Sequence, residues 1–290
     1  PTGDAPFWGM PKLPLGRAYN RATWRLVEAL TGLGTRGYLR DWRQQHDREG
    51  RSRASTPSQL RAGVPIPVIH GYSQAVSPRP ADWPAHAHVS GYWFLDESVG
   101  SDGAAWQPPA TLLGFLDSGP PPVYIGFGSM ASAHPAATTQ LILGAIQQAG
   151  VRAVLARGWG GIVEAKLPAN VYALDEAPHT WLFPRMAAVV HHGGAGTTAA
   201  ALRAARPSLI CPFGIDQPYW GHRVADLGAG PTPLPQKRLT AQALGSALTK
   251  LVTQPSYQTA ATHIAQTIAT EDGVATAVAI IERVAAEWRR

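Results

Sequence analysis

The sequence predicts an α/β protein whose larger part is built on a parallel β-sheet. From Pro122 onward, short apolar runs with the composition of buried strands alternate with longer segments of helical periodicity. Turns rich in glycine and proline separate the two kinds of segment. The chain has 290 residues, of which 45% are hydrophobic, so it can bury one large core or two smaller ones.

The first part of the chain, residues 1–105, is rich in proline and tryptophan and has fewer clear elements. Apolar positions at helical spacing predict a helix over about 15–43. Two short apolar runs predict strands near 68–71 and 89–93, and the composition of 78–84 and 104–109 predicts loops.

In the second part, buried parallel strands are predicted at 122–127, 171–174, 186–191 and 208–211. The alanine-rich segment 199–205 predicts a helix after the third of these strands, and Pro207 ends it. Helical patterns then cover 240–253, 257–270 and 273–290, and no internal repeat is visible.

The segment 191–198 carries the clearest chemical signal. Gly193, Gly194 and Gly196 allow a tight turn and a close approach of the backbone to a ligand. A helix is expected to begin near Thr197, so its free N–H groups would form an anion site at the carboxyl end of the sheet. The alternative is a well-packed turn that binds no ligand.

The residue types around this turn disfavour several other kinds of site. The glycine spacing matches neither the dinucleotide fingerprint nor the P-loop, which disfavours pyridine nucleotides and ATP. Neighbouring residues on a strand point to opposite faces, so one of His191 and His192 should pack inward while the other meets the ligand. A zinc site would need further ligands at familiar spacing, so no metal is predicted.

The segment from His192 to Thr198, read together with Asp216 and Gln217, resembles the donor-site signature of GT-B nucleotide-sugar glycosyltransferases, the family 1 UDP-glycosyltransferases. The spacing between the two parts is the one expected for that family. The segments 90–96, 123–130 and 177–184 resemble most the branch with bacterial and fungal sterol 3-beta-glucosyltransferases and antibiotic glycosyltransferases. The resemblance runs from about residue 6 to the end.

The resemblance implies a role for each matching residue. The donor diphosphate would be held by Ser129, His192, Gly193, Gly194, Gly196 and Thr197. The donor sugar would meet Asp216 and Gln217, with Trp220 as a candidate wall of its pocket, and the base would meet Ala177 and His179. Trp159 is a candidate for lining the nucleotide cleft. Ser129 in a plain turn, His179 as a helix cap and both tryptophans as core are the structural alternatives.

The resemblance also implies the architecture. It predicts a GT-B fold with a complete C-terminal Rossmann-like domain and only part of the N-terminal one. The expected divisions are 1–105 for the acceptor domain and linker, 106–272 for the donor domain, and 273–290 for a helix that packs back on the N-terminal domain. Two plant-branch contacts are missing, since Glu176 replaces a base-stacking tryptophan and Ala200 replaces a ribose-binding glutamate.

The expected reaction is inverting transfer of a hexose, glucose in the first place, from a UDP-sugar to a hydroxyl of a lipophilic acceptor. Such a step needs a general base. His46, His70, His86 and His88 do not fit the family's context for one, so no catalytic residue is assigned, and sequence upstream of Pro1 is expected to supply it. A nucleotide-sugar-binding module without catalysis and a TDP-deoxysugar transferase are the alternatives. No cofactor is expected.

Composition bounds the compartment and the partners. The single cysteine, Cys211, rules out a disulfide framework and predicts a reducing, cytoplasmic setting. No apolar run has membrane-spanning length, and no signal peptide is visible. The net charge is +6, and the basic stretch 36–53 is either a solvated helix end or a weak contact with an anionic membrane. No recognition motif for nucleic acid accompanies it.

Overall fold

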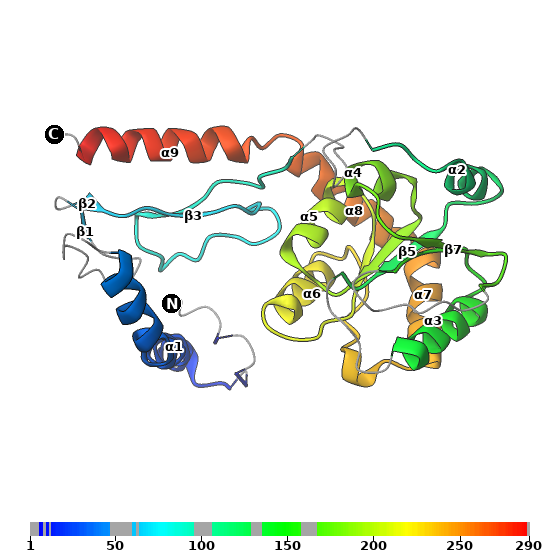
Figure 1. The fold of residues 1–290 in the computed structure, drawn as a ribbon, viewed down its shortest axis with the longest axis horizontal. Helices are drawn as coiled ribbons and strands as arrows, with labels where there is room; N and C mark the ends of the chain where they lie inside the picture. Colours follow the sequence, from blue (N-terminus) through cyan, green and yellow to red (C-terminus); the bar gives the residue numbers. More distant parts are fainter. Residues whose placement is uncertain are drawn as a thin grey trace. The chain divides into compact units, whose positions relative to one another are not determined.

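The computed structural model describes residues 6–7, 10–11, 13–46, 60–61, 64–95, 106–128, 135–157 and 167–288. The chain divides into two compact units (Figure 1). The first unit combines residues 1–93 with residues 272–290, and the second unit contains residues 94–271.

The second unit is built on a five-stranded parallel sheet with the strand order β7-β6-β5-β8-β9. The chain steps outward from β5 to β7 and then returns to the other side of β5, so the order reverses between β5 and β8. Ligands bind at such a reversal in open parallel sheets. The strands are β5 (Val123–Gly126), β6 (Ala153–Ala156), β7 (Val171–Leu174), β8 (Ala188–His191) and β9 (Ser208–Ile210).

Helices cover both faces of this sheet, which explains why most residues of its strands are apolar. Val123 and Ile125 face a core shared with α3 and α7, while Tyr124 faces a second core shared with α2, α4 and α5. The helices are α2 (Ala110–Asp117), α3 (Pro135–Ala149), α4 (His179–Leu182), α5 (Ala195–Arg203), α6 (Gln217–Asp226), α7 (Ala241–Thr253) and α8 (Pro255–Ile268), with 3-10 turns η1 (Phe183–Arg185) and η2 (Gln236–Arg238).

The predicted α/β class with a parallel sheet is confirmed, and the four predicted strands are all present. The predicted start of the helix near Thr197 is wrong by two residues, because Gly194 is the N-cap and α5 begins at Ala195. The Thr198 hydroxyl donates to the Gly194 carbonyl over 2.9 Å and therefore does not cap the helix. The uncapped N–H groups of α5 come from residues 195–197.

The first unit contains a long helix, two strand pairs and the C-terminal helix. Its elements are α1 (Gly16–His46), β1 (Leu60–Arg61), β2 (Val64–Pro65), β3 (Val68–His70), β4 (Ala87–Val89) and α9 (Gly273–Trp288). β1 and β2 are antiparallel, whereas β3 and β4 are parallel. The strand predicted at 89–93 is wrong, since β4 ends where that prediction begins.

Residues 91–93 pack against the start of α9 instead of forming a strand. A Cβ at Gly273 would lie 2.4 Å from the Tyr92 carbonyl oxygen, so only glycine fits there. The Trp93 indole N–H donates to the Gly273 carbonyl over 3.2 Å and to the Ser90 hydroxyl over 2.9 Å. These contacts fix the start of α9 within the first unit.

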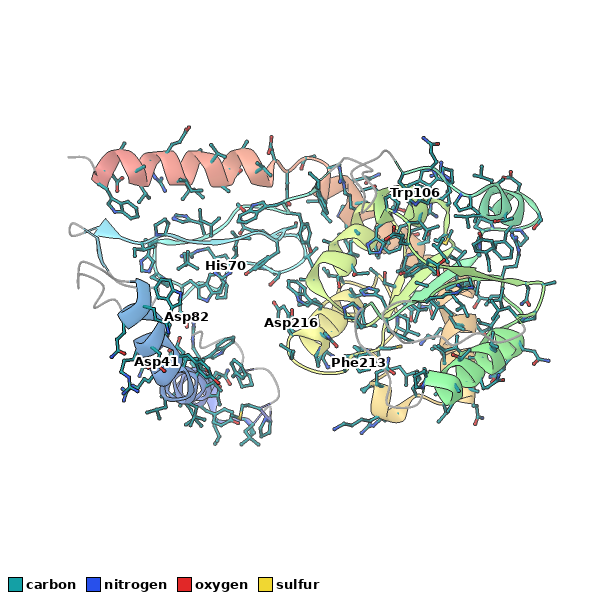
Figure 2. All side chains as sticks on the ribbon, viewed as in Figure 1. Asp41, His70, Asp82, Trp106, Phe213 and Asp216 are labelled. Atoms are coloured by element: carbon teal, nitrogen blue, oxygen red, sulfur yellow. The ribbon has the colours of Figure 1, made fainter. Side chains whose placement is uncertain are left out.

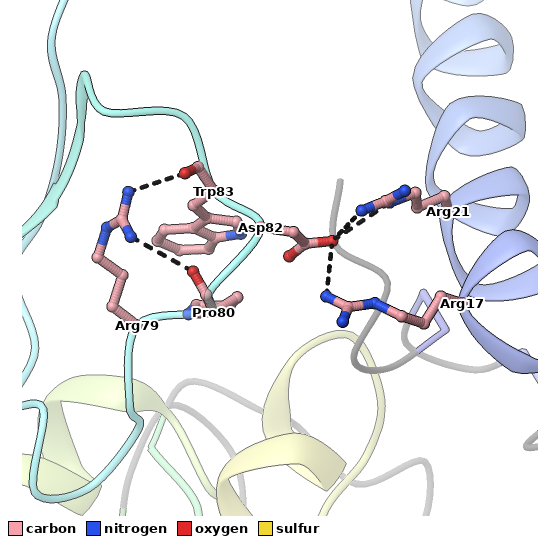
Figure 3. Close-up of polar contacts among 6 residues, drawn as sticks. All are labelled: Arg17, Arg21, Arg79, Pro80, Asp82 and Trp83. Carbon is pink, nitrogen blue, oxygen red and sulfur yellow. Dashed lines mark hydrogen bonds and ion pairs between the residues drawn. The ribbon is translucent and has the colours of Figure 1, made fainter.

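The loop predicted at 78–84 is held by two sets of arginine contacts, one at Asp82 and one made by Arg79 (Figure 3). Asp82 accepts a hydrogen bond from Arg21 over 2.9 Å and lies 3.6 Å from Arg17, so α1 is tied to this loop. Arg79 donates to the Trp83 and Pro84 carbonyls over 2.9 and 2.8 Å. The loop is therefore held by charged side chains together with a backbone turn, in which the Trp83 N–H donates to the Pro80 carbonyl over 3.2 Å.

By length and mean hydropathy alone, residues 255–288 could cross a membrane. The segment is divided into α8 and α9, which have 14 and 16 residues. Each is shorter than the roughly 20 residues that a bilayer requires. α8 also buries Tyr257, Ala261 and Ile264, so its apolar character is explained by packing.

Candidate functional site

The candidate site lies where β5 and β8 end side by side. Gly126 pairs with His191 at the last position of both strands, so the loops that follow leave the sheet together. Gly128 has a φ of +62°, and a Cβ there would lie 3.1 Å from the His192 ring. The loop after β5 therefore folds directly onto His192.

The His192 ring is held between two glycines. A Cβ at Gly128 would lie 3.1–3.8 Å from three atoms of the ring, and a Cβ at Gly194 would lie 2.6 Å from its Nε2. The ring is half-buried, and its Nδ1 has no hydrogen-bond partner among the residues that the structure describes. Burial lowers the pKa of His192, and the opposing influence of Asp216 is smaller. His192 is therefore a neutral, positioned hydrogen-bonding group at neutral pH.

Gly193 joins this turn to the segment 213–217. Its φ of +94° favours glycine, and a Cβ would lie 2.5 Å from Ile210 Cγ2 and 3.0 Å from the Gln217 carbonyl oxygen. Both the backbone conformation and the available space therefore require glycine, which brings the His192 turn next to the start of α6.

His191 is fully buried, and His192 is not, as predicted from the alternation of side chains on a strand. The His191 Nδ1 accepts the Gly193 N–H over 3.1 Å, so the proton of the neutral ring lies on Nε2. Burial lowers the pKa of His191 to about 3, with smaller contributions from His192 and His179. His191 thus fixes the turn from inside.

Falling pH should destabilise the fold through His191. In the unfolded chain its pKa is about 6.5, whereas in the folded chain it is about 3. Between these values only the unfolded chain binds the proton, so stability is lost as pH falls, at about 1.4 kcal/mol per pH unit. Urea unfolding from pH 7 to 4 measures this slope. His191→Asn should flatten it, and an unchanged slope would contradict the assignment.

Asp216, which is labelled in Figure 2, and Gln217 are both held from within the protein. The Trp220 indole N–H donates to Asp216 Oδ2 over 2.9 Å. The Gln217 Oε1 accepts the backbone N–H groups of Phe213 and Gly214 over 2.8 and 3.3 Å. Trp220 is only 7% exposed, so it orients the carboxylate from the core, which is the structural alternative given for it above. Both polar side chains are therefore fixed before any ligand arrives.

Ile215 stores backbone strain next to this pair. It is a β-branched residue at a φ of +59°, and its side chain is 78% exposed. The left-handed region costs such a residue about 1–2 kcal/mol. The hydrogen bonds of Gln217 to the preceding backbone hold the turn in this conformation.

Ile215→Gly is expected to raise the free energy of unfolding by about 0.5–1 kcal/mol, because relief of strain exceeds the entropic cost of glycine. Little packing is lost, since the side chain is exposed. Ile215→Ala retains the Cβ and should give no gain. Thermal unfolding of both variants is the measurement, and equal stabilisation would rule out backbone strain as the cause.

His179 begins α4 and lies beside the same edge of the sheet. Its ring stacks on Phe183 with centroids 4.2 Å apart, and burial followed by His192 lowers its pKa. The N-cap of α4 is Pro178, so His179 is not the cap that the alternative reading proposed. Ala177 is half-buried and packs against the core that contains Phe183.

The structure brings together most of the predicted site residues, although their contacts with a ligand stay predictions. Gly196 and Thr197 lie in the first turn of α5, and a Cβ at Gly196 would meet nothing within 4 Å. Ser129 and Trp159 lie outside the described residues. Among the described residues, no group of three or more histidine, cysteine, aspartate or glutamate side chains could hold a metal ion.

Sequence reasoning missed Gly128 and Tyr124 as contributors to this edge. Gly128 was visible as the second glycine after the first strand of the sheet, yet its contact with His192 depends on the pairing of β5 with β8. Tyr124 stands in an apolar strand, where a tyrosine is expected to be core.

Residues 153–283 match the family described as erythromycin biosynthesis protein CIII-like, C-terminal domain. The matched segment spans from β6 into α9 and contains His192 and Asp216. Its polar site lies at the reversal of strand order, as expected for a ligand-binding α/β sheet.

Curated relatives extend the similarity beyond this segment. A sterol 3-beta-glucosyltransferase of Arabidopsis thaliana is 39% identical over 285 residues, which cover 96% of this chain and 42% of that protein. A sterol 3-beta-glucosyltransferase of Aspergillus terreus is 36% identical over 288 residues, which cover 95% of this chain and 20% of that protein. The chain thus spans less than half of the length of these relatives.

Solved structures show the same fold. The glycotransferase of kitacinnamycin has a TM-score of 0.65 at 19% identity, covering 96% of this chain and 68% of its own. VinC in complex with DTDP (TM-score 0.55, 23% identity) and LpCGTa in complex with UDP (TM-score 0.58, 12% identity) cover 76% and 78% of this chain, and 52% and 56% of their own chains. The predicted resemblance to GT-B glycosyltransferases of the sterol 3-beta-glucosyltransferase-like branch is confirmed, as is the GT-B type of fold.

Proposed function

We propose that this chain holds the donor of an inverting glycosyltransferase, which moves glucose from UDP-glucose to a hydroxyl of a lipophilic acceptor such as a sterol. The similarity to sterol 3-beta-glucosyltransferases over 95–96% of the chain supports the acceptor class. The observation that carries the proposal is the His192 ring fixed between Gly128 and Gly194, with the anchored Asp216 close enough to influence its pKa.

The diphosphate would lie against His192 and the first turn of α5. The free N–H groups of residues 195–197 and the positive end of the helix favour an anion there. As the acceptor oxygen bonds to the anomeric carbon, the bond from that carbon to the β-phosphate oxygen breaks, and UDP leaves with the electron pair. Donors aimed at the diphosphate stabilise the charge that develops in this step.

The sugar would be oriented by Asp216 and Gln217. The carboxylate accepts hydrogen bonds from sugar hydroxyls, and its contact with Trp220 fixes its direction. The nucleoside-diphosphate sugar is a co-substrate, and the proposal includes neither a cofactor nor a metal. The proton of the acceptor hydroxyl needs a general base, and we assign none to this chain.

Calorimetry with UDP-glucose, TDP-glucose and ADP-glucose tests the donor. UDP-glucose should bind at least tenfold more tightly than ADP-glucose, since the base loop near His179 is expected to read a pyrimidine. Stronger binding of TDP-glucose would favour the deoxysugar transferase, for which VinC with DTDP is a structural parallel. Absence of binding for all three would overturn the proposal. If the longest natural chain binds the donor but transfers no glucose to a sterol, the protein is a nucleotide-sugar-binding module without catalysis.

We also propose a cytoplasmic location with peripheral attachment to an anionic membrane, where a lipophilic acceptor would be found. Leu26, Leu30 and Leu33 lie at helical spacing on α1 and are 51–58% exposed. Arginines of the same helix, including Arg36 and Arg40, would favour acidic headgroups. Co-sedimentation of the protein with vesicles should increase when about 30% of the neutral lipid is replaced by phosphatidylserine, which gives the vesicles a charge close to physiological. Equal sedimentation with both kinds of vesicle would contradict the attachment.

A further inference from the structure

Tyr124 is a polar residue of the sheet whose hydroxyl has no role in the fold. The residue is 7% exposed, and its ring packs edge-on against Phe183 and His179 with centroids 5.0 and 6.1 Å apart. Within the described chain, no hydrogen bond reaches its hydroxyl. A buried phenol usually has a hydrogen-bond partner for its O–H group. A bound ligand can supply that partner here.

The hydroxyl ends at the carboxyl edge of the sheet. A Cβ at Gly126 would lie 2.3 Å from the Tyr124 Oη, so the phenol occupies the space that a side chain at Gly126 would fill. Residues i and i+2 of a strand share a face, and the ring therefore runs along β5 toward its end. Gly126 pairs with His191 there, immediately before the His192 turn.

Tyr124 also lies on the face of the sheet that carries both predicted parts of the nucleotide site. Its core includes residues of α4, such as Leu182, and of α5, such as Ala201. α4 begins at His179 in the base loop, whereas α5 begins directly after Gly194 in the diphosphate turn. His179 and His192 are close enough for the charge of one to lower the pKa of the other. The Tyr124 hydroxyl thus borders the base loop and the diphosphate turn.

We infer that the Tyr124 hydroxyl hydrogen-bonds the ribose of the nucleoside-diphosphate donor and is therefore a further donor-binding residue. The inference rests on the proposed function. In any nucleotide the ribose joins the base to the α-phosphate, so a group between the two subsites meets the ribose. A phenol can donate to one ribose hydroxyl and accept from another.

The environment keeps this phenol suited to that role. Burial raises the pKa of Tyr124 to about 12, so its proton is retained at every physiological pH. Gly126 leaves room for the hydroxyl at the edge, and a larger residue there would displace the ring. The ribose contact is consequently available without ionisation and without rearrangement of the strand.

Tyr124→Phe removes the hydroxyl and retains the ring packing. Calorimetry should show UDP binding weakened by about 3- to 10-fold, as for loss of one neutral hydrogen bond. Affinity for inorganic pyrophosphate should stay within about twofold of wild type. Wild type should also bind 2′-deoxy-UDP or 3′-deoxy-UDP more weakly than UDP, and Tyr124→Phe should lose that discrimination. Tyr172→Phe is the matched control. Tyr172 lies on β7, and its hydroxyl forms a hydrogen bond with Thr111 over 2.9 Å. This variant should bind UDP like wild type.

Each outcome decides the inference. Unchanged UDP affinity in Tyr124→Phe overturns the ribose contact alone and leaves the proposed function standing. Equal losses for UDP and pyrophosphate, or retained discrimination between UDP and both deoxy analogues, also overturn it. If the wild type binds no nucleoside diphosphate, both the inference and the proposed function fail. Thermal unfolding of both variants shows whether the fold is retained.

Discussion

Gly194→Ala is expected to weaken UDP binding by about 10- to 100-fold while changing the free energy of unfolding little. Gly194 has φ −61° and ψ 141°, which any residue adopts, so alanine introduces no backbone strain. Its methyl group would, however, lie 2.6 Å from the His192 Nε2. The ring must turn away, and loss of its bond to a charged phosphate costs about 1.5–3 kcal/mol.

Gly114→Ala is the matched control, a glycine-to-alanine change within α2 and outside the candidate site. A Cβ there meets nothing within 4 Å, so UDP affinity should stay within about twofold of wild type. The variant should also gain stability, because alanine favours the helix over glycine. Calorimetry and thermal unfolding of both variants separate the two effects. Equal loss of UDP affinity in both would show that the loss does not come from displacement of the His192 ring.

Asp216→Asn is expected to weaken UDP-glucose binding by about 10- to 100-fold while UDP affinity stays the same. Asparagine has the same shape and can still accept the Trp220 indole N–H. The charge is lost, and with it the charge-assisted hydrogen bonds to sugar hydroxyls, which are worth about 1.5–3 kcal/mol together. UDP lacks the transferred glucose and therefore reports only on the contacts with the base, the ribose and the diphosphate. Calorimetry with the two ligands gives the comparison.

Two further variants sharpen this test. Trp220→Phe removes the indole donor that orients Asp216, together with part of the buried ring, and should weaken UDP-glucose binding by a smaller factor, again without effect on UDP. Asp226→Asn lies on the same helix and forms an exposed contact with Arg223, so both affinities should be unchanged. Equal losses of UDP and UDP-glucose affinity in Asp216→Asn would contradict a sugar contact.

The strands and the candidate site were predictable where one short segment carries the signal. The apolar run before His191 predicts β8, and the glycine spacing after it predicts the turn. The start of α5 was harder to predict from the sequence, because the glycine-rich residues 193–196 are poor helix formers. What decides that start is local geometry, namely the extended Gly194 and the return of the Thr198 hydroxyl to its carbonyl.

Features that depend on distant parts of the chain were not predictable from local pattern. The aromatic run 92–94 favours a strand by composition. Residues 91–93 instead pack against Gly273, which lies near the other end of the sequence. The sequence alone could not decide whether Trp220 lines a pocket or lies in the core, and its bond to Asp216 depends on the turn of α6. β6 was missed because Ala153–Ala156 is short and half alanine.

The hydrogen bond between Trp93 and Gly273 has a consequence for modularity. The second unit enters after residue 93 and leaves before residue 272, so its two connections to the first unit start from neighbouring points. A segment inserted between neighbouring points can be exchanged at low entropic cost, because closing the remaining chain needs only a short span. Residues 94–271 are thus a natural cassette, which can be exchanged between relatives by joining the chains at these two positions.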